Sequence, residues 1–368
     1  MSVTSTSNGS IYLEVPYLNI SSNESISQGS NPIYLNTSLH EVGEYSDTRG
    51  VYIYSDVDVA VYVTNFLSSS TDTYLSLPLE MLGTHYTVMS YTPQDDNFDK
   101  SEFLVLGAHD DTIVTVKYLN GSTIEVRLDR LDVFQDADFM DLSGTTVSAT
   151  KPVSVIAGAT CTGVNGRFCD MVATELLPHQ HLGTNYIIPS AFHSKEFLLR
   201  AVPVSNVTDS LELCRDTEPD LYNTIAAGSV IDLNDLIKPA TVIATLPVMV
   251  VQFINTDSFM TLIPSIDQYT NEYSLTVPEV YAEFSNYIAV VVPDAAKDGI
   301  LINGAVPTSL NSTYTVAVPY QNYTMLVYDI DIGYQYLNHT DGANFHVSVF
   351  GFFMNGRYGF SAGLTLDN

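Results

Sequence analysis

Carboxylates are the groups in this chain whose type and spacing come closest to a chemical site. They recur in three groups, at Asp95-Asp96 with Asp99, at Asp110-Asp111, and at Asp129, Asp132, Asp136, Asp138 and Asp141. Calcium takes about six to eight oxygen ligands, and loops of extracellular β proteins supply them. If calcium is bound, we expect Asp110, Asp111, Asp136 and Asp138 to be ligands. The alternative for Asp110-Asp111 is a turn between two strands, because aspartate tolerates turn geometry.

The sequence gives only weak evidence for a catalytic site. It has no Gly-X-Ser-X-Gly elbow and its eight histidines are scattered, which argues against a nucleophilic triad. His179 and His181 flank Gln180 and could supply two metal ligands, although exposed loop histidines are the simpler interpretation. Paired carboxylates for glycoside cleavage are compatible with the composition, but no cleft is indicated. We therefore predict that the protein is not an enzyme.

Tyrosines are the stronger candidates for binding. The chain has 24 of them, and an aromatic ring with a polar tip gives a large contact area at low entropic cost. Core packing and strand propensity account for most of them. Several crowd the N-terminal end, at Tyr12, Tyr17, Tyr34, Tyr45, Tyr52 and Tyr54. A tyrosine surface that binds protein or sugar is one hypothesis for this end.

The chain has three cysteines, which limit the disulfides that it can form. Cys161 and Cys169 enclose a turn-rich loop, Thr-Gly-Val-Asn-Gly-Arg-Phe. They could form a short disulfide that fixes this loop, remain reduced, or supply two ligands of a metal site. Cys214 is left over, either as a buried thiol or as half of a bond to a partner outside this sequence.

Glycosylation signals favour a secretory route. Asn-X-Ser/Thr sites occur at Asn8, Asn19, Asn23, Asn36, Asn120, Asn206, Asn311, Asn322 and Asn338. Residues 1–5 contain neither a basic stretch nor an apolar segment, so no signal peptide is evident. We expect a processed piece of a larger extracellular protein, either secreted or the ectodomain of a cell-surface protein.

The charge balance limits the possible partners. A formal net charge of −29 argues against nucleic acid and against anionic membrane surfaces. The longest apolar run, residues 242–254, is interrupted by polar residues and is too short to span a bilayer. The expected partners are an extracellular protein or a glycan, with self-association through Cys214 or an open sheet edge as a further option. No cofactor is expected apart from possible calcium.

Internal repetition is the clearest organising feature. The segment Leu-Pro-X-X-X-Leu-Gly-Thr-X-Tyr occurs at residues 77–86 and 177–186, and a more divergent copy begins at residues 262–264 and runs to Tyr273. Each copy follows a valine-rich strand. A period of about 85 to 100 residues suits one small β-sandwich per repeat, whereas a propeller blade is about half as long.

The strand pattern predicts an all-β fold of tandem antiparallel β-sandwich-like repeats, packed as one rigid unit. Residues 103–108, 112–118 and 123–128 read as a three-stranded meander. We divide the chain into a loosely ordered Ser/Asn-rich lead-in at 1–45 and one β domain at 46–366. The repeats within this domain are about 46–140, 141–235 and 236–335, with a half-repeat at 336–366 that completes an open edge. The only helical turns are expected near residues 232–237.

The order of these motifs resembles the N-terminal domain of the IgGFc-binding protein family, which comprises large secreted, mucin-associated proteins. The matching pieces are Asp141-Leu142-Ser143-Gly144-Thr145, the Cys161 to Cys169 loop, Leu177-Pro178, residues 247–253, Asn286-Tyr287-Ile288 and residues 358–364. The resemblance implies an extracellular recognition or adhesion domain without enzymatic activity, and a cysteine pair at Cys161 and Cys169. It gives no motif for immunoglobulin contact, so that activity is not transferred to this chain.

Three functions follow as hypotheses. The first is a non-enzymatic extracellular adhesion or recognition domain that binds a protein or glycan. The second is a structural spacer of a mucus, matrix or adhesive polymer that self-associates. The third, a secreted hydrolase, would require a cleft with converging carboxylates or a triad.

Overall fold

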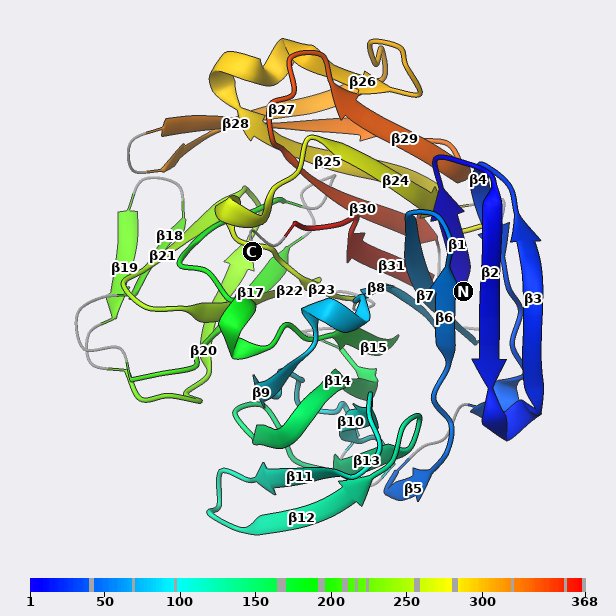
Figure 1. The fold of residues 1–368 in the computed structure, drawn as a ribbon. Helices are drawn as coiled ribbons and strands as arrows, with labels where there is room; N and C mark the ends of the chain where they lie inside the picture. Colours follow the sequence, from blue (N-terminus) through cyan, green and yellow to red (C-terminus); the bar gives the residue numbers. More distant parts are fainter. Residues whose placement is uncertain are drawn as a thin grey trace.

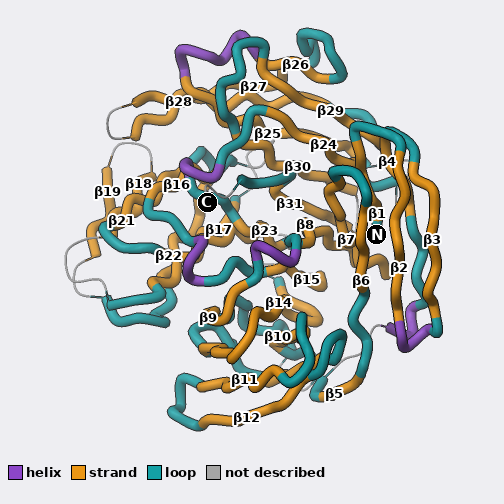
Figure 2. The backbone as a smooth tube through the Cα atoms, viewed as in Figure 1, coloured by secondary structure: helices purple, strands orange, loops and turns teal. Residues whose placement is uncertain are grey.

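The structure is a computed structural model of residues 1–368. It describes residues 1–39, 43–67, 70–95, 98–163, 170–190, 196–206, 211–215, 218–222, 225–254, 259–279, 284–318, 321–353 and 356–365. The described fold is all-β, built from antiparallel sheets. Its short 3-10 turns lie in the connections between strands (Figure 2).

Four β-sandwiches are arranged in a ring and follow one another around it in chain order (Figure 1). The first contains β1 (Ser2–Ser5), β2 (Gly9–Val15), β3 (Ile20–Ile26), β4 (Gly29–Pro32), β6 (Tyr52–Ser55), β7 (Val59–Leu67) and β8 (Ser70–Ser76). The second contains β9 (Gly83–Thr87), β10 (Ser101–Gly107), β11 (Thr112–Lys117), β12 (Thr123–Leu128), β13 (Val133–Asp138), β14 (Thr146–Thr162) and β15 (Asp170–Glu175), with β5 (Tyr45–Asp47) paired to β13.

The other two sandwiches follow along the chain. The third contains β16 (Asn185–Ile188), β17 (Phe197–Pro203), β18 (Leu211–Arg215), β19 (Glu218–Tyr222), β20 (Ile231–Leu236), β21 (Ala240–Ala244), β22 (Val248–Ile254) and β23 (Met260–Leu262). The fourth contains β24 (Glu272–Val277), β25 (Ser285–Pro293), β26 (Ile300–Ile302), β27 (Leu310–Val318), β28 (Gln321–Asp329), β29 (Gly333–His339), β30 (His346–Phe353) and β31 (Gly356–Ser361).

Six 3-10 segments join these strands. They are η1 (Pro16–Leu18), η2 (Thr37–Leu39), η3 (Leu79–Met81), η4 (His179–His181), η5 (Ile266–Gln268) and η6 (Asp294–Gly299). The repeated Leu-Pro segments contain η3 and η4, and the divergent third copy contains η5.

In the third and fourth sandwiches one sheet is buried on both faces, which explains its continuous apolar sequence. In the sheet β20-β17-β22-β23, Leu199 and Val250 belong to the core of the third sandwich. On the opposite face, Leu198 and Val251 belong to the core of the second. Full burial of one such side chain contributes about 1.5–3 kcal/mol. Packing of each sandwich on its neighbour is therefore a main source of the stability of the ring.

Hairpin strands at the outside of the ring alternate between buried and exposed residues. In β11, Val114 and Val116 face the core while Ile113 and Thr115 are half-buried, and β12 alternates in the same way. This pattern is expected where one face of a sheet meets water. The outer hairpins are therefore the parts of the ring that can contact a partner.

Four inner strands close the ring. β8 contacts β15 and β31, and β23 contacts β31 and β15, so each sandwich contributes one strand (Figure 1). The closure joins distant parts of the sequence: Tyr62 of β7 donates a hydrogen bond to the backbone oxygen of Ala362, and its ring lies 5.2 Å from that of Phe360. The final strands β30 and β31 thus complete the fourth sandwich and meet the first.

The repeated tyrosine fixes the corner at which the second, third and fourth sandwiches begin. The Tyr186 hydroxyl accepts the N–H of Gly183 at 2.9 Å and donates to the oxygen of Val248 at 2.6 Å, where β22 starts. The same pair of contacts joins Tyr86 to Gly83 and Val153, and Tyr273 to Thr270 and Phe345. We call Tyr86, Tyr186 and Tyr273 the latch tyrosines.

The glycine of the repeated segment is required by the next repeat. A Cβ atom on Gly83 would lie 2.5 Å from the Cβ of Pro178, and one on Gly183 would lie 2.3 Å from the Oγ of Ser265. Each Leu-Pro segment therefore packs on the glycine of the preceding one. The third copy has Thr270 at this position, and no further Leu-Pro segment follows it.

Three details differ from the sequence-based expectations. Where we expected a loosely ordered lead-in, residues 1–32 form β1 to β4, because Val3, Ile11 and Ile26 supply a core of their own. The meander over 103–128 is wrong: β11 pairs with β12, but β10 pairs with β13 and β14 in the other layer. The chain changes layer at Asp111, whose φ is 56°. The helical turns expected near 232–237 are wrong as well, since this segment forms β20.

Candidate functional site

Three tyrosines gather on the outer face of the sheet β3-β2-β6 in the first sandwich, where Tyr54 is exposed and Tyr12 and Tyr52 are half-buried. Along β2, Ile11 and Leu13 are buried in the core, so Tyr12 points to the other side. Tyr12 is opposite Tyr54 of β6, and the ring of Tyr52 lies 6.5 Å from that of Tyr12. Directly opposite residues of an antiparallel pair share one face. We call Tyr12, Tyr52 and Tyr54 the aromatic face.

An ion pair borders the aromatic face. Arg130, from the loop after β12, donates to both carboxylate oxygens of Glu14, at 2.9 and 3.3 Å. Its guanidinium also lies 4.5 Å from the ring centre of Tyr52. The hydrogen bond from Arg130 lowers the pKa of Glu14. Fork-shaped Arg–carboxylate pairs of this kind are geometrically well defined, so the edge of the aromatic face is fixed by the second sandwich.

The remaining N-terminal tyrosines lie outside the aromatic face. Tyr17 and Tyr45 flank Arg49, whose guanidinium is 4.4 and 5.2 Å from their ring centres. Tyr34 is 91% exposed on the segment after β4. The structure therefore brings three of the six tyrosines into one surface, and the sequence-based grouping at one end is only partly a spatial grouping.

Buried acids lie at the centre of the ring. Asp72 of β8 accepts the N–H of Ala173 in β15 at 2.9 Å and that of Met260 in β23 at 3.4 Å. Glu175 accepts hydrogen bonds from Ser76, Leu77 and Ser154. Burial raises the pKa of both carboxyls. A cavity of about 20 Å³ beside Glu175 has room for one water molecule.

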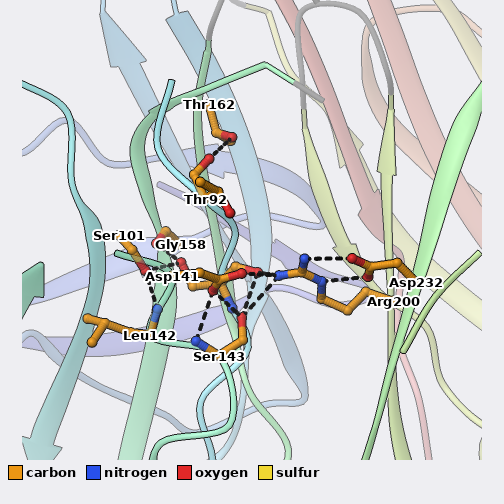
Figure 3. Close-up of polar contacts among 10 residues, drawn as sticks. Thr92, Ser101, Asp141, Leu142, Ser143, Gly158, Thr162, Arg200 and Asp232 are labelled. Carbon is orange, nitrogen blue, oxygen red and sulfur yellow. Dashed lines mark hydrogen bonds and ion pairs between the residues drawn. The ribbon is translucent and has the colours of Figure 1, made fainter. Parts of the chain in front are cut away.

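A buried arginine clamps the second sandwich to the third (Figure 3). Arg200 of β17 is 4% exposed and pairs with Asp141 at 2.7 Å and with Asp232 at 2.8 Å. It also donates to the oxygen of Ser90 at 2.7 Å, and Tyr91 stacks on its guanidinium at 4.4 Å. Each of the three guanidinium nitrogens thus donates at least one hydrogen bond. We call this group the Arg200 clamp.

The sequence motif around Asp141 serves the same clamp. Ser143 accepts a hydrogen bond from Arg200 at 3.1 Å, and its hydroxyl donates to Asp141 at 2.6 Å. Gly144 has φ of +89°, and a Cβ there would lie 2.4 Å from the oxygen of Gly228, so only glycine fits. Sequence reasoning did not assign Arg200. The available signal was a single charge within the apolar run at residues 197–202, which indicates a buried ion pair.

The predicted calcium ligands have other contacts. Asp110 accepts the N–H of Arg130 at 3.0 Å, and Asp111 pairs with Arg127 at 3.1 Å on the surface. On β13, Asp136 accepts a hydrogen bond from the Tyr118 hydroxyl, and Asp138, the last residue of the strand, accepts the N–H of Met140. Across the ranges that the structure describes, no three His, Cys, Asp or Glu residues are grouped to hold a metal ion. The calcium site stays a prediction.

The two histidines around Gln180 point to different partners. His179 Nε2 lies 2.9 Å from the hydroxyl of Thr87, and burial lowers the pKa of His179 to about 4. His181 Nε2 lies 3.1 Å from the side chain of Gln180, and partial burial lowers the pKa of His181. The contact of His179 with Thr87 joins η4 to β9.

The cysteines divide as one bonded and one free. Cys161, near the end of β14, is disulfide-bonded, while Cys214 of β18 is a free thiol. Cys169 lies outside the described residues, so the predicted pairing of Cys161 with Cys169 stays a prediction. The Cys214 thiol lies 3.6 Å from Glu212, and burial raises its pKa.

The predicted glycan sites are at or near the surface. Eight of the nine asparagines are exposed, and Asn338 of β29 is half-buried. Asn23 of β3 is directly opposite Tyr12, so a glycan there would stand on the aromatic face. Occupancy of these sites stays a prediction. The described residues include no helix that is long and apolar enough to cross a membrane.

Two comparisons show which known proteins this chain is similar to. The human (Homo sapiens) IgGFc-binding protein is 29% identical over 177 residues, which is 45% of this chain and 3% of the human protein. The chain therefore spans a small part of that relative. The crystal structure of a tetra-tandem repeat in the extending region of a large adhesion protein covers 98% of this chain and 92% of its own, with 10% identity and a TM-score of 0.11. A TM-score this low shows no common fold.

A family model described as IgGFc binding protein matches residues 72–351, from the inner strand β8 to β30. The match includes the Arg200 clamp and the latch tyrosines. It leaves out the aromatic face of the first sandwich. Because the match covers more than half of the sequence, the chain belongs to the IgGFc-binding protein family.

Proposed function

We propose that this chain is a non-enzymatic extracellular recognition domain that holds a protein or glycan partner against the aromatic face. The observation that carries the proposal is the grouping of Tyr12, Tyr52 and Tyr54 on one side of a sheet whose other side is buried, with Tyr54 exposed and the other two half-buried. Tyr54 is 59% exposed. Exposed tyrosines on a rigid sheet give contact area at little entropic cost, and tyrosine is enriched among residues that dominate binding energy.

Family membership supports an adhesive role outside the cell. The related human protein is named for binding the Fc part of immunoglobulin G. Because this chain spans only a small part of that protein, its own partner is an open choice between protein and glycan. The exposed sequons support passage through the secretory route. The buried acids at the ring centre are held by backbone and hydroxyl donors, which suits a structural role better than hydrolysis.

The test is binding of the purified domain to an array of extracellular proteins, mucins and glycans, with and without a calcium chelator. We expect a specific partner whose affinity falls about tenfold or more in Tyr54→Ala, which corresponds to about 1.4 kcal/mol. Tyr34→Ala is the matched control, because Tyr34 is exposed but lies off the aromatic face. Equal losses in both variants would contradict the assignment of this surface.

The same experiment needs a control for a glycan on Asn23. Asn23→Gln removes any glycan opposite Tyr12 without changing the tyrosines. If a glycan covers the aromatic face, this variant binds more tightly than the glycosylated protein. Loss of binding with the chelator would instead indicate that calcium is required. It would support the prediction that Asp110, Asp111, Asp136 and Asp138 are calcium ligands.

A self-associating structural spacer is the second candidate. It is favoured by the free Cys214 and by Leu221, which is 61% exposed, in the hairpin β18–β19. Two results together would support this alternative over recognition. The array would show no binding, and sedimentation analysis would show oligomers that are absent in Cys214→Ser.

A further inference from the structure

The fourth sandwich departs from the strand pairing of the other three. In those sandwiches two successive outer strands form a hairpin within one sheet, as β2–β3, β11–β12 and β18–β19 do. In the fourth, β26 is only three residues long and pairs with β29, while β27 pairs with β28 in the opposite sheet. A sheet of order β27-β28-β25-β30-β31 therefore faces a shorter one of order β24-β29-β26.

This change of sheet leaves an open cleft at the β27 end. The cleft has a volume of about 550 Å³, within the range typical of ligand sites. Its floor includes Leu326 and Thr324, which are almost fully buried. One wall is η6, and the opposite wall is the segment between β26 and β27, which carries Val306 at 67% exposure.

Both walls are held rigidly by the sandwich. The turn after β26 has Asn303 and Gly304 at positive φ, and Asn303 exchanges backbone and side-chain hydrogen bonds with Tyr336 at 2.7 and 2.9 Å. On the other side, the ring of His339 lies 2.7 Å from the oxygen of Ala296, and Thr340 donates to the oxygen of Gly299 at 2.9 Å. The cleft is thus pre-formed, which reduces the entropic cost of binding.

The charges of the cleft indicate the kind of ligand. Lys297 is paired with Asp294 at 3.0 Å, and Asp294 also accepts a hydrogen bond from Thr324. Asp298 is exposed, and no cation in the described part of the chain lies within ion-pairing distance of it. The cleft therefore presents one uncompensated carboxylate beside apolar groups. A ligand that fits must carry a positive charge on an apolar body.

A lysine-bearing peptide segment matches these features better than a neutral sugar. Sugar sites commonly offer an exposed aromatic ring, but the one aromatic residue of this cleft, Tyr328, is only 6% exposed. Thr313 and Thr315 of β27 are exposed hydroxyl donors and acceptors that suit a peptide backbone. We propose that the cleft between η6 and β27 binds a basic peptide segment of a partner protein, with Asp298 receiving its cationic side chain.

The probe for this proposal is a fluorescein-labelled peptide of alternating leucine and lysine, measured by fluorescence anisotropy. We expect Asp298→Asn to weaken its binding about threefold to fivefold, in the range of exposed ion pairs. Asp331→Asn is the matched control: it removes the same charge from the same sandwich, at an exposed residue that does not line the cleft. We expect this control to bind as the unmodified chain does.

Two further arms test the place and the ligand class. Thr313→Trp fills the cleft from an exposed position and should abolish binding, and bound peptide should slow hydrogen exchange in residues 294–299. Equal losses in Asp298→Asn and Asp331→Asn would overturn the proposal, because they would indicate general attraction to an acidic protein. Absence of binding would also overturn it. Capture of a neutral oligosaccharide that depends on Thr313 but not on Asp298 would assign the cleft to sugars instead.

Discussion

Two sets of tyrosines in this molecule show how position decides the role of one residue type. The latch tyrosines inside the ring direct their hydroxyls at backbone groups; Tyr186, for example, is 1% exposed and holds Val248. On the aromatic face Tyr12 and Tyr52 are half-buried and Tyr54 is 59% exposed, and within the described ranges no hydrogen bond joins the Tyr54 hydroxyl to the backbone. The comparison teaches that the inner tyrosines determine stability, whereas the outer ones are available for binding.

The largest effect is expected at the Arg200 clamp, on the inner side of this comparison. Arg200→Met leaves Asp141 and Asp232 without their partner and should lower the free energy of unfolding by about 3 kcal/mol, as for other broken buried pairs. Arg127→Met is the control, because its pair with Asp111 is 65% exposed on both sides and should cost less than about 1 kcal/mol. Urea unfolding measures both. Similar losses would contradict the view of Arg200 as a clamp.

A smaller effect is expected at a latch tyrosine. Tyr186→Phe keeps the ring but removes the hydroxyl between Gly183 and Val248, so two backbone groups lose a partner. We expect the free energy of unfolding to fall by about 1–2 kcal/mol. Tyr34→Phe, at an exposed residue, should leave it unchanged. Urea titration measures the free energy of unfolding of both variants. An unchanged value for Tyr186→Phe would show that the latch hydroxyl does not stabilise the fold.

The smallest effect concerns pH and contrasts two glutamates. Burial raises the pKa of Glu102 to about 7 from an ordinary value of 4.5. The folded state therefore holds this proton more tightly than the unfolded chain does. Its contribution to stability is fully present below pH 4.5 and is lost as the pH rises through about 7.

The contribution of Glu14 to stability has the opposite pH dependence. Because the hydrogen bond from Arg130 lowers the pKa of Glu14, this contribution is lost as the pH falls. Urea midpoints at about pH 5.5 and pH 8 test this difference. We expect Glu102→Gln to be stabilised at the higher pH relative to the unmodified chain. Glu14→Gln should show no such gain. A pH response that is unchanged in Glu102→Gln would show that other groups cause it.

The fold was predictable where the sequence repeats. Valine-rich strands and the Leu-Pro-X-X-X-Leu-Gly-Thr-X-Tyr segments indicated stacked sandwiches, because a strand buried on both faces must be apolar throughout. The first sandwich was less visible, since its strands are rich in Ser and Asn and its core depends on few residues such as Val3 and Ile11. The layer change at Asp111 could not be read either, because a turn residue does not reveal which sheet the next strand joins.

Less of the candidate sites could be predicted. The sequence indicated tyrosines at one end, but only strand register shows that Tyr12 and Tyr54 are opposite each other while Tyr34 lies apart. The cleft of the fourth sandwich depends on β27 pairing with β28. Its residues are separated in sequence and carry no motif, so spacing alone could not bring Asp298 and Thr313 together.

The most direct measurement takes the partner found on the array and determines its affinity for Tyr54→Ala and Tyr186→Phe alongside their urea unfolding. We predict that Tyr54→Ala binds about tenfold more weakly and unfolds within about 0.5 kcal/mol of the unmodified chain. We predict that Tyr186→Phe binds normally and is less stable. Normal binding by Tyr54→Ala, or a loss of binding in Tyr186→Phe that exceeds its own, would contradict the separation of binding and stability between the two sets of tyrosines.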